Sequence, residues 1–426
     1  MIGRLRIAVV GCGTAGAAVA LLLARSSAGH DVTVFERVPA PGPVGAGIMM
    51  QPSGLLVLER LGLADRIVAR GAHVARLLCE TAAGRGVLDL QYEVLAPGLF
   101  GVGLHRGVLF ETLFGALSTS PARLVCGVSI ERIRSAPRDR VGVVDGDGTD
   151  QGEFDLVLVC DGARSRVRDS MTHLAKTVRP YPWGALWFIG DDPEGRYAGK
   201  LHQIVGGTQR MVGLLPTGFG PSGNDASLVS LFVSTRSDAV ESVQARGLAA
   251  WKEEVLAVAP LAAPVLDQID DLGQLTFASY YDVVLPRWHA HRVALLGDAA
   301  HATSPQLGQG CNLALCDAAA LADAIDAEPT VERALARYTA SRRAHLGFYQ
   351  LATRWLTPFF QSDFVLLGSL RDVLLGPASG IRFVEREMVR SMAGTKTGIF
   401  SGSRETRMPR VEAPSLAAPY SATLAR

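Results

Sequence analysis

Short apolar runs alternate with glycine-rich turns in the first part of the chain. Ile7–Val10 is uninterruptedly apolar, and three glycines and the small-residue segment Ala17–Ala24 follow it. Asp31–Phe35 is a second strand-like run, and Asp155–Cys160 and Val293–Leu296 are two more. Strands that alternate with a helical pattern predict an α/β fold with a parallel sheet.

The pattern changes between residues 175 and 285. There, short strand-like runs are separated by turn residues, and the runs Trp183–Ile189, Gln209–Leu215 and Ala226–Thr235 predict a second, mainly antiparallel sheet. Residues 72–100 are expected to add a strand or two to it.

Helices are expected from about residue 330 to residue 400. Val331–Arg354 is amphipathic and rich in arginine, and Trp355–Leu375 is strongly apolar, with a break expected at Pro358. The predicted organisation is a discontinuous Rossmann-like domain (1–72, 101–174 and 286–345), an inserted substrate-binding β-sheet domain (73–100 and 175–285), a C-terminal helical region (346–408) and a flexible tail (409–426).

Composition narrows the class of protein. Of 426 residues, 48% are hydrophobic and 19% charged, which is typical of a globular chain with a large core. The net charge of +1 gives no bulk field for nucleic acid. The six cysteines form no CxxC pair and no metal motif, so we expect reduced thiols, a cytoplasmic location and no metal.

The 18 uncharged residues Ile7–Ala24 have the length of a membrane segment, but their glycines favour another interpretation. Gly11, Gly13 and Gly16 form GxGxxG between a strand and a helix, and Glu36 lies 20 residues after Gly16 at the end of the next strand. The first glycine permits a tight turn, the second lets a pyrophosphate approach the helix N-terminus, and the third lets helix and strand pack closely. The carboxylate can accept hydrogen bonds from a ribose. This predicts a dinucleotide site and no transmembrane segment.

Two later strands end in aspartate. Asp161-Gly162 follows the first, and Gly297-Asp298 follows the second, where open α/β sheets bind their ligands. A loop rich in Gly and Pro over 304–310 then leads into a helix expected over Cys311–Ala327. The N–H groups at the start of that helix could face the partly negative N1–C2=O edge of a reduced flavin.

Together these motifs resemble the p-hydroxybenzoate hydroxylase type of single-component FAD-dependent monooxygenase. The resemblance rests on GxGxxG with Glu36, on Asp161, Gly162, Ser165 and Arg168, and on the block from Asp298 to Asn312. It implies non-covalent FAD held by the following residues: Gly11, Gly13, Ala15, Gly16, Glu36, Arg37, Gly47, Arg106, Val128, Asp161, Asp298, Pro305, Gly308, Gly310, Cys311 and Asn312.

The resemblance also implies individual roles. Arg106 would reach the phosphate and ribityl region, Asp298 would bind the ribityl chain, and Pro305 would lie over the reactive face of the flavin. Pro305 and Gly310 are thus the candidate catalytic positions, through their backbone. Val128, in a strand expected over Leu124–Ile130, would lie against the adenine or in the core.

Only one GxGxxG is present, so no second Rossmann domain for a nicotinamide is expected. The resemblance implies that NADH or NADPH docks transiently and reduces the flavin. O₂ then forms a C4a-hydroperoxide that hydroxylates an aromatic, heteroaromatic or quinone-like small molecule. The candidate substrate residues are Trp187, Gln209, Arg210 and Phe232. His301 is interpreted as a hydrogen-bonded support of its loop, with a role as base as the alternative.

Other functions remain open from the sequence. A related epoxidase and a halogenase are alternatives, although the halogenase WxWxIP motif is absent, because Trp183 and Trp187 stand four apart with no proline after Ile189. A non-catalytic FAD- or substrate-binding protein and a nicotinamide-only dehydrogenase are further alternatives. The C-terminal helices would pack on the FAD domain or on a partner subunit of a homodimer, and contact with a membrane surface or a lipophilic substrate is the other possibility.

Overall fold

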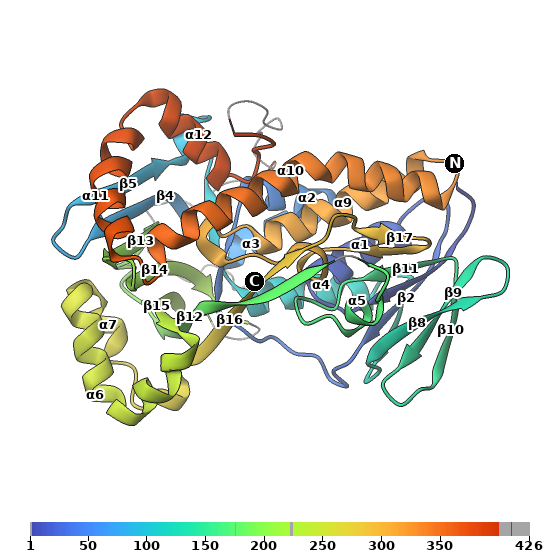
Figure 1. Ribbon diagram of the computed structural model, residues 1–426, viewed down its shortest axis with the longest axis horizontal. Coiled ribbons are helices and arrows are strands. Elements are labelled where there is room, and N and C mark those ends of the chain that lie inside the picture. Colours follow the sequence, from blue (N-terminus) through green and yellow to red (C-terminus); the bar gives the residue numbers. More distant parts are fainter. Residues whose placement is uncertain (1, 175, 222–224, 400–409, 411–426) are drawn as a thin grey trace, which may run out of the picture.

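The computed structural model of the protein describes residues 2–174, 176–221, 225–399 and 410. Within them the chain forms three β-sheets, and helices cover the first sheet and one end of the largest (Figure 1). The predicted fold class, a Rossmann-like α/β domain with a mainly antiparallel sheet and C-terminal helices, is confirmed.

The first sheet is built from the apolar runs of the sequence. Its order is β17 (His289–Ala290), β18 (Val293–Leu295), β11 (Leu156–Val159), β1 (Arg6–Val10), β2 (Asp31–Glu36) and β7 (Arg123–Cys126). All pairs except β17–β18 are parallel. Ile7, Ala8 and Val9 are completely buried, as is usual for the central strands of a parallel sheet. The carboxyl ends of β1, β11 and β18 therefore lie side by side at one edge.

Helices surround this sheet. They are α1 (Thr14–Ala24), α2 (Pro52–Arg60), α3 (Ala64–Arg70), α4 (Arg106–Ser118), α5 (Arg166–Ser170), α8 (Asp298–His301), α9 (Gly310–Ala327) and α10 (Val331–Phe360). α9 packs against α1, α2 and α10, which places its N-terminus at the edge where the parallel strands end. A small antiparallel sheet of β8 (Ile130–Ala136), β9 (Arg140–Asp145) and β10 (Asp150–Phe154) lies beside the first.

The large sheet has nine strands. Its order is β16 (Thr276–Val284), β12 (Thr177–Asp191), β15 (Ser227–Arg236), β14 (Arg210–Phe219), β13 (Gly199–Gly206), β4 (Ala72–Thr81), β6 (Gly101–His105) and β3 (Gly47–Met50), and β5 (Gly86–Gln91) pairs with β4. Only the β13–β4 pair is parallel. β3 and β6 come from segments assigned to the Rossmann-like domain by the sequence, so the two parts of the molecule share these strands.

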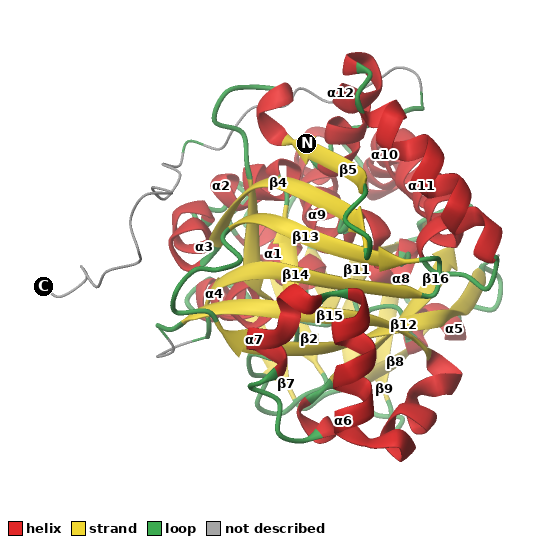
Figure 2. Ribbon diagram, turned by 90° about the vertical axis from the view of Figure 1, so that its left-hand side faces the viewer, coloured by secondary structure: helices red, strands yellow, loops and turns green. Residues whose placement is uncertain are grey.

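The two faces of the large sheet have different neighbours. Along β15, Val229, Leu231 and Val233 pack with α6 (Val240–Val258) and α7 (Ala263–Leu266), which lie across the sheet in Figure 2. The alternate residue Phe232 faces the other side, where it packs with Phe360 of α10. Short 3₁₀ turns complete the structure: Tyr92–Val94, Ser237–Ala239, Pro260–Ala262, Leu272–Gln274 and Pro305–Leu307.

Two sequence predictions of element bounds are wrong. The strand expected over 124–130 ends at Cys126, because Gly127 has φ +80° and turns the chain before β8 begins. The helix break expected at Pro358 occurs later, since α10 continues to Phe360 and α11 (Val365–Ser379) and α12 (Arg382–Met392) follow. A proline in the last turn removes one hydrogen bond only, and the helix tolerates it there. Of the predicted tail, only Arg410 is among the described residues.

Candidate active site

The first glycine-rich loop leaves an open space in front of a helix N-terminus. Gly11 has φ +94°, and a Cβ on it would lie 2.7 Å from the Cys160 oxygen. A Cβ on Gly16 would lie 1.9 Å from the Gly11 oxygen, so both positions require glycine. A Cβ on Gly13 would meet nothing within 4 Å in the described chain. Ala15 is buried beneath this loop. The space beside Gly13 can therefore receive a pyrophosphate.

Glu36 ends the second strand beside this loop. Its carboxylate accepts hydrogen bonds from the Cys12 N–H at 2.9 Å and the Val38 N–H at 3.0 Å. The Val128 N–H donates to the Glu36 carbonyl oxygen at 3.0 Å, so the half-buried Val128 lies at the same end of the sheet. Arg37 is exposed next to them. Glu36, Arg37 and Val128, which the resemblance assigned to the adenosine end of FAD, thus lie together at one end of the sheet.

Burial makes Cys12 unreactive. Loss of hydration raises the pKa of its thiol to about 12, and the negative charge of Glu36 adds to the effect. The thiol therefore stays protonated at physiological pH, which agrees with a packing role.

Asp161 ends β11 at the edge of the parallel sheet. Burial raises the pKa of its carboxyl, and its Oδ1 atom has no hydrogen-bond partner in the described part of the chain. A buried acceptor without a partner costs about 1–3 kcal/mol, unless a ligand supplies a donor. The orphaned oxygen is thus an observation that favours an occupant with hydroxyl groups at this position.

Arg168 joins the two aspartate loops. It is completely buried; its Nη2 donates to the Ala163 oxygen at 2.9 Å and its Nη1 to the Ala299 oxygen at 3.2 Å. Ser165 caps the short helix α5 by accepting from the Arg168 N–H at 3.0 Å. In the sequence Arg168 was identified only as part of a motif. In the structure it connects the two loops through its hydrogen bonds.

The Gly297–Asp298 turn rests on a buried ionic cluster. Gly297 has φ +58°, and its N–H donates to Asp317 Oδ2 at 2.9 Å. The same carboxylate binds His301 Nε2 at 2.5 Å and Arg342 Nε at 2.7 Å. Burial alone would raise the pKa of Asp317, but His301, Arg342 and the Gly297 N–H outweigh it and hold the pKa well below its usual range.

This cluster decides the role of His301. Its side chain is turned toward Asp317 and is almost completely buried, so it supports the loop, as the sequence interpretation preferred. Asp298 itself is exposed at the edge of the sheet. Sequence reasoning missed Asp317 and Arg342. The one available signal was a single acidic residue within the apolar part of the Ala/Leu-rich helix.

The loop after Asp298 leads to the N-terminus of α9. Pro305 and Gly310 are exposed, Gly308 has φ +61°, and a Cβ on Gly310 would lie 4.0 Å from Asp298 Oδ1. Cys311 is half-buried, and burial raises the pKa of its thiol to about 12. The charges of both Arg106 and Asp298 act on that thiol, which places these residues together.

Asn312 has a different place from its neighbours. Its side chain is completely buried, donates to the Met49 oxygen at 3.0 Å and accepts from the Gln51 N–H at 2.8 Å. The Gln51 side chain in turn accepts from the hydroxyl of the buried Tyr92. The Asn312 side chain therefore fastens α9 to β3 and α2, and only its backbone is free to line a cofactor.

β3 and the start of α4 also lie near these loops. A Cβ on Gly47 would lie 2.3 Å from Ser230 Oγ, so this glycine lets β3 approach the large sheet. Arg106 is exposed at the first position of α4, and its N–H donates to the Ala46 oxygen at 3.1 Å. Its stem lies under Gly45, which has φ +115°. Arg106 thus lies near Cys311, as Asp298 does.

The candidate substrate residues fall into two groups. Trp187 and Phe232 are cross-strand partners with ring centroids 4.9 Å apart, on the sheet face that lies away from α6. Arg210 lines a cavity against α6, on the other face, and Gln209 Nε2 donates to Asp363 Oδ1 at 3.4 Å. The structure therefore does not bring Gln209 and Arg210 together with the cofactor loops.

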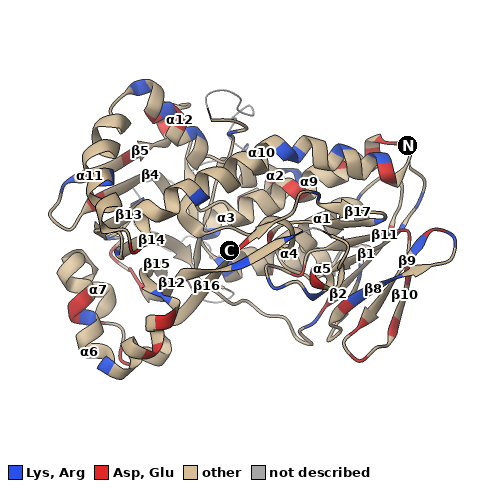
Figure 3. Ribbon diagram, viewed as in Figure 1, with Lys and Arg blue, Asp and Glu red and all other residues tan. Residues whose placement is uncertain are grey.

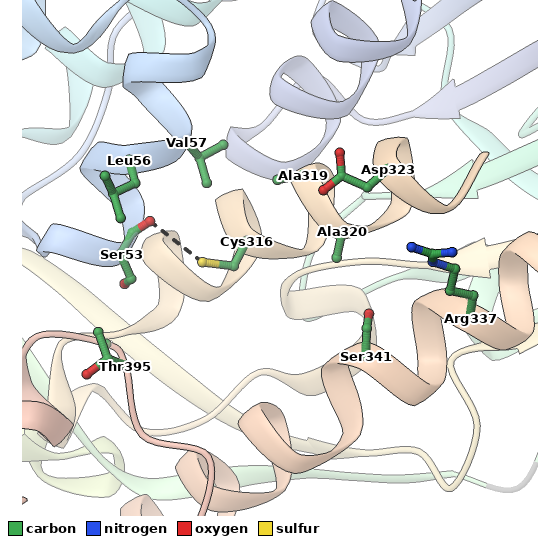
Figure 4. A pocket seen from close by; sticks show the side chains of 11 residues that line it. Ser53, Leu56, Val57, Cys316, Ala319, Ala320, Asp323, Arg337, Ser341 and Thr395 are labelled. Carbon is green, nitrogen blue, oxygen red and sulfur yellow. Dashed lines mark hydrogen bonds between the residues drawn. The ribbon is translucent and has the colours of Figure 1, made fainter. Parts of the chain in front are cut away.

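A separate cavity of about 320 Å³ is lined by α2, α9, α10 and the segment at Gly394 (Figure 4). Its two charged side chains have partners: Asp323 pairs with Arg60 at 2.6 Å and Arg337 with Glu328 at 3.3 Å. No residue of the cofactor loops lines it, so it is not part of the candidate active site.

Three distant segments thus meet at the carboxyl ends of β1, β11 and β18, and comparison with known proteins identifies what they hold. Residues 4–347 match the family described as the FAD binding domain, and the chain belongs to this family. It is an FAD-dependent monooxygenase of the aromatic-hydroxylase type, so the resemblance to p-hydroxybenzoate hydroxylase-type enzymes is confirmed.

Individual relatives agree with this family assignment. The chain is 32% identical to 3-amino-4-hydroxybenzoate 2-monooxygenase of Streptomyces cremeus, over 80% of this chain and 83% of that one. It is 29% identical to 6-hydroxynicotinate 3-monooxygenase of Pseudomonas fluorescens, over 79% of this chain and 87% of that one. In fold it is similar to Klebsiella pneumoniae HpxO complexed with FAD and uric acid, with TM-score 0.76, 21% identity, and coverage of 91% and 97%.

The residues present fit FAD. The space beside Gly13, the orphaned oxygen of Asp161 and the exposed Asp298 match a pyrophosphate and a polyol chain in size and chemistry. In the described residues, no helix combines the length and apolarity required to cross a bilayer.

Proposed function

We propose that the protein hydroxylates an aromatic, heteroaromatic or quinone-like ring that carries an amino or hydroxyl group, with NADH or NADPH as reductant and O₂ as oxygen donor. NAD(P)H gives a hydride, one oxygen atom replaces a ring hydrogen as hydroxyl, and the other oxygen leaves as water. The ring substituents are proposed because two relatives act on 3-amino-4-hydroxybenzoate and 6-hydroxynicotinate. When bound, FAD supplies the hydride acceptor and the activation of O₂.

In this proposal the chain's own residues bind and orient. Gly11, Gly13, Ala15 and Gly16 face the pyrophosphate, and Glu36, Arg37 and Val128 hold the adenosine end. Arg106, Asp161 and Asp298 bind the ribityl and phosphate region, with Gly47 beside them. The backbone of Gly308, Gly310, Cys311 and Asn312 lines the polar edge of the flavin.

The N-terminus of α9 has a particular task. The first N–H groups of a helix have no partner within the helix, and the macrodipole favours negative charge in front of them. Gly310 and Cys311 are at this end, so charge that develops on the nearby flavin edge is stabilised there. Pro305 lies over the reactive face of the flavin in this proposal.

Trp187 and Phe232 are the proposed substrate contacts. They lie on the large-sheet face that is turned away from α6, and Trp187 Nε1 is 3.4 Å from the Tyr280 hydroxyl. Aromatic side chains with a few polar tips are the usual lining of a site for a planar ring.

The proposal includes the domain boundaries expected from the sequence, a cytoplasmic location and a homodimer. All six cysteines are free, which supports a reducing compartment.

The observation that carries the proposal is that the Gly13, Asp161 and Asp298 loops lie side by side at the carboxyl ends of β1, β11 and β18. Purified protein should be yellow, and it should consume NADH or NADPH faster in the presence of a substrate. Amino- and hydroxy-substituted benzoates, nicotinates and quinolones form the panel, and under ¹⁸O₂ the product should gain one ¹⁸O atom.

Three outcomes would contradict the proposal. Protein that stays colourless and takes up no FAD contradicts the cofactor site. Flavin-containing protein whose NAD(P)H oxidation no compound accelerates contradicts the substrate class. Substrate-stimulated oxidation that yields only hydrogen peroxide, without labelled product, contradicts hydroxylation of that compound.

A further inference from the structure

One face of the large sheet extends from the loop before α9 to the proposed substrate contacts. Met49 lies at the near end, where a Cβ on Gly308 would be 3.8 Å from the Met49 Cβ. Met49 packs with Leu215, and Leu201 joins this group to the cluster that contains Phe232. The side chains between the Gly308 loop and Phe232 are therefore those that a substrate ring would meet in the proposed function.

The positions on this face follow from strand periodicity. Alternate residues of a strand point to opposite sides of a sheet, and Phe232 marks the side turned away from α6. The strand register places on the same side every second residue of 185–189, 201–205, 211–215 and 230–234, counted from the first. We call these positions the inner face.

None of the inner-face positions carries a charge. Their side chains are apolar or aromatic, or the residue is glycine, apart from Gln203, Ser230 and Ser234. The charged residues of β12, β13, β14 and β15 lie toward the strand ends: Arg179, Asp191, Lys200, Arg210 and Arg236. The middle of these strands is accordingly tan in Figure 3. A carboxylate bound at the inner face would lose hydration without gaining a counter-charge from it.

A buried arginine near this face is already neutralised. The charge of Arg371 acts on the Cys79 thiol of the neighbouring strand β4. Its guanidinium pairs with Asp372 at 2.6 Å and donates to the Gly207 oxygen at 3.0 Å and the Phe359 oxygen at 2.9 Å. Every nitrogen of the guanidinium is engaged in these bonds. Arg371 therefore does not provide a site for a substrate carboxylate.

Gln203 differs from the other polar side chains of the inner face. Ser230 Oγ lies 2.8 Å from Thr217 Oγ1, and Ser234 Oγ accepts from the Met211 N–H at 2.9 Å. The half-buried Gln203 amide has no hydrogen-bond partner among the described residues. A bound ring that displaces water from this amide must supply a partner, because an unsatisfied buried amide is costly.

The position of Gln203 links it to the aromatic pair. It lies opposite Gly213 in the register of β13 and β14. A Cβ on Gly213 would lie 1.9 Å from the Phe232 ring, so this ring lies across β14 toward Gln203. The Trp187 ring follows, with its centroid 4.9 Å from that of Phe232. The free amide therefore borders on the two proposed substrate contacts.

We propose that the substrate is a neutral ring without a carboxylate, and that Gln203 is its polar contact. The inference rests on the proposed function and narrows the substrate class of that site. The amide N–H donates to a carbonyl or hydroxyl oxygen of the ring, or the amide oxygen accepts from a ring N–H, hydroxyl or amino group. Trp187 and Phe232 bind the planar part of the ring. Gln203 thus determines specificity.

The first test uses pairs of compounds that differ only in a carboxylate. The pairs are 2-aminophenol with 3-amino-4-hydroxybenzoate, 2-hydroxypyridine with 6-hydroxynicotinate, and 4(1H)-quinolone with 4(1H)-quinolone-2-carboxylate. Equilibrium dialysis with the FAD-loaded protein gives the Kd of each compound. In the pair that binds best, the neutral compound should bind about a hundredfold more tightly, because the carboxylate finds no counter-charge on the inner face.

The second test changes Gln203 itself. Gln203→Leu removes the amide at nearly constant volume and should raise the KM and Kd of the neutral compound about tenfold, with kcat changed less than about twofold. Gln203→Arg places a cation on the inner face and should tighten binding of the carboxylate partner at least about tenfold. A merely structural role of Gln203 would not give that gain. Gln244→Leu, at an exposed position on α6, is the matched control and should leave both Kd values unchanged.

Three results overturn the inference. One is a carboxylate that the wild type binds as tightly as its neutral partner, or more tightly. The second is a failure of all three neutral rings to bind at about 1 mM, the weak end of specific affinity. The third is an unchanged Kd of the neutral compound in both Gln203 variants.

Hydroxylation of each compound is measured separately from binding. A neutral ring that binds as expected but is not hydroxylated contradicts the proposed function and leaves this inference intact. A carboxylate that binds tightly and is hydroxylated contradicts only this inference. The comparison of compound pairs requires no variant, so it decides the question even where a Gln203 variant fails to fold.

Discussion

Asp317→Asn tests whether the buried ionic cluster holds the cofactor loop. The Asp317 carboxylate is completely buried and neutralises Arg342, which is also completely buried, while binding His301 and the Gly297 N–H. Asparagine keeps the size of the side chain but removes the charge and turns one acceptor into a donor. The variant therefore leaves a buried guanidinium without a counter-charge.

The magnitude follows from that burial. Removal of one partner from a buried ion pair costs about 3–5 kcal/mol. With an unfolding entropy of about 2 cal/mol/K per residue, the 426 residues give ~0.9 kcal/mol/K, so the expected fall in Tm is roughly 3–6 °C. The Gly297–Asp298 turn also loses its anchor. We expect FAD to bind at least tenfold more weakly, a change of about 1.4 kcal/mol.

The assay is thermal unfolding followed by circular dichroism, with an FAD titration of the apoprotein. The matched control is Asp323→Asn on the same helix, where Asp323 forms a half-exposed pair with Arg60. Surface pairs contribute about 0–1 kcal/mol, so the control should change Tm by less than ~1 °C.

The pH dependence gives an independent check. The pKa of Asp317 is lowered in the folded protein, so its contribution to stability is fully present above the unfolded value of ~3.9 and is lost as the pH falls through the folded pKa. The difference between wild type and Asp317→Asn should be constant from pH 6 to pH 8 and shrink below about pH 4. A variant as stable as wild type at pH 7, or with unchanged FAD affinity, would refute the reasoning.

Four further substitutions separate cofactor, packing and substrate contributions. Gly13→Ala should fold normally and bind FAD at least tenfold more weakly, because its Cβ enters only the open space. Gly16→Ala should lower Tm, because its Cβ meets a backbone oxygen at 1.9 Å. Equal Tm values for the two variants would contradict this. Tyr92→Phe leaves the buried Gln51 oxygen without its donor and should cost about 1–3 kcal/mol in urea unfolding. Arg210→Ala should leave the substrate KM within twofold, since its side chain lies in the cavity against α6; a tenfold rise would place Arg210 in the substrate site.

The cofactor half of the site could be predicted because it depends on short-range patterns. A strand, a glycine turn and a helix follow one another within twenty residues at Gly11–Gly16, and both aspartate turns directly follow apolar strands. Local sterics and hydrophobicity determine the backbone structure of such segments. The same holds for α9, whose composition alone predicts a helix.

The rest depends on contacts between distant segments. β13 carries few strand signals of its own and forms because neighbouring strands pair with it. Asp317 looks like a surface residue in the sequence, and only the approach of His301 and Arg342 makes it buried. Gln209 and Arg210 are adjacent to a strand that contributes to the site, but the hairpin geometry of β13 and β14 carries them away from the cofactor loops.

The bonds of Arg168 also limit how the enzyme could be re-engineered. One guanidinium joins carbonyl groups of Ala163 and Ala299, 136 positions apart in the chain. Neither turn can be replaced alone by the corresponding turn of a homologue. If the arginine and the two turns do not match, a buried backbone oxygen is left without a hydrogen-bond donor. Chimeras in which both segments are exchanged together should retain bound FAD and its yellow colour. Chimeras in which only one segment is exchanged should lose both.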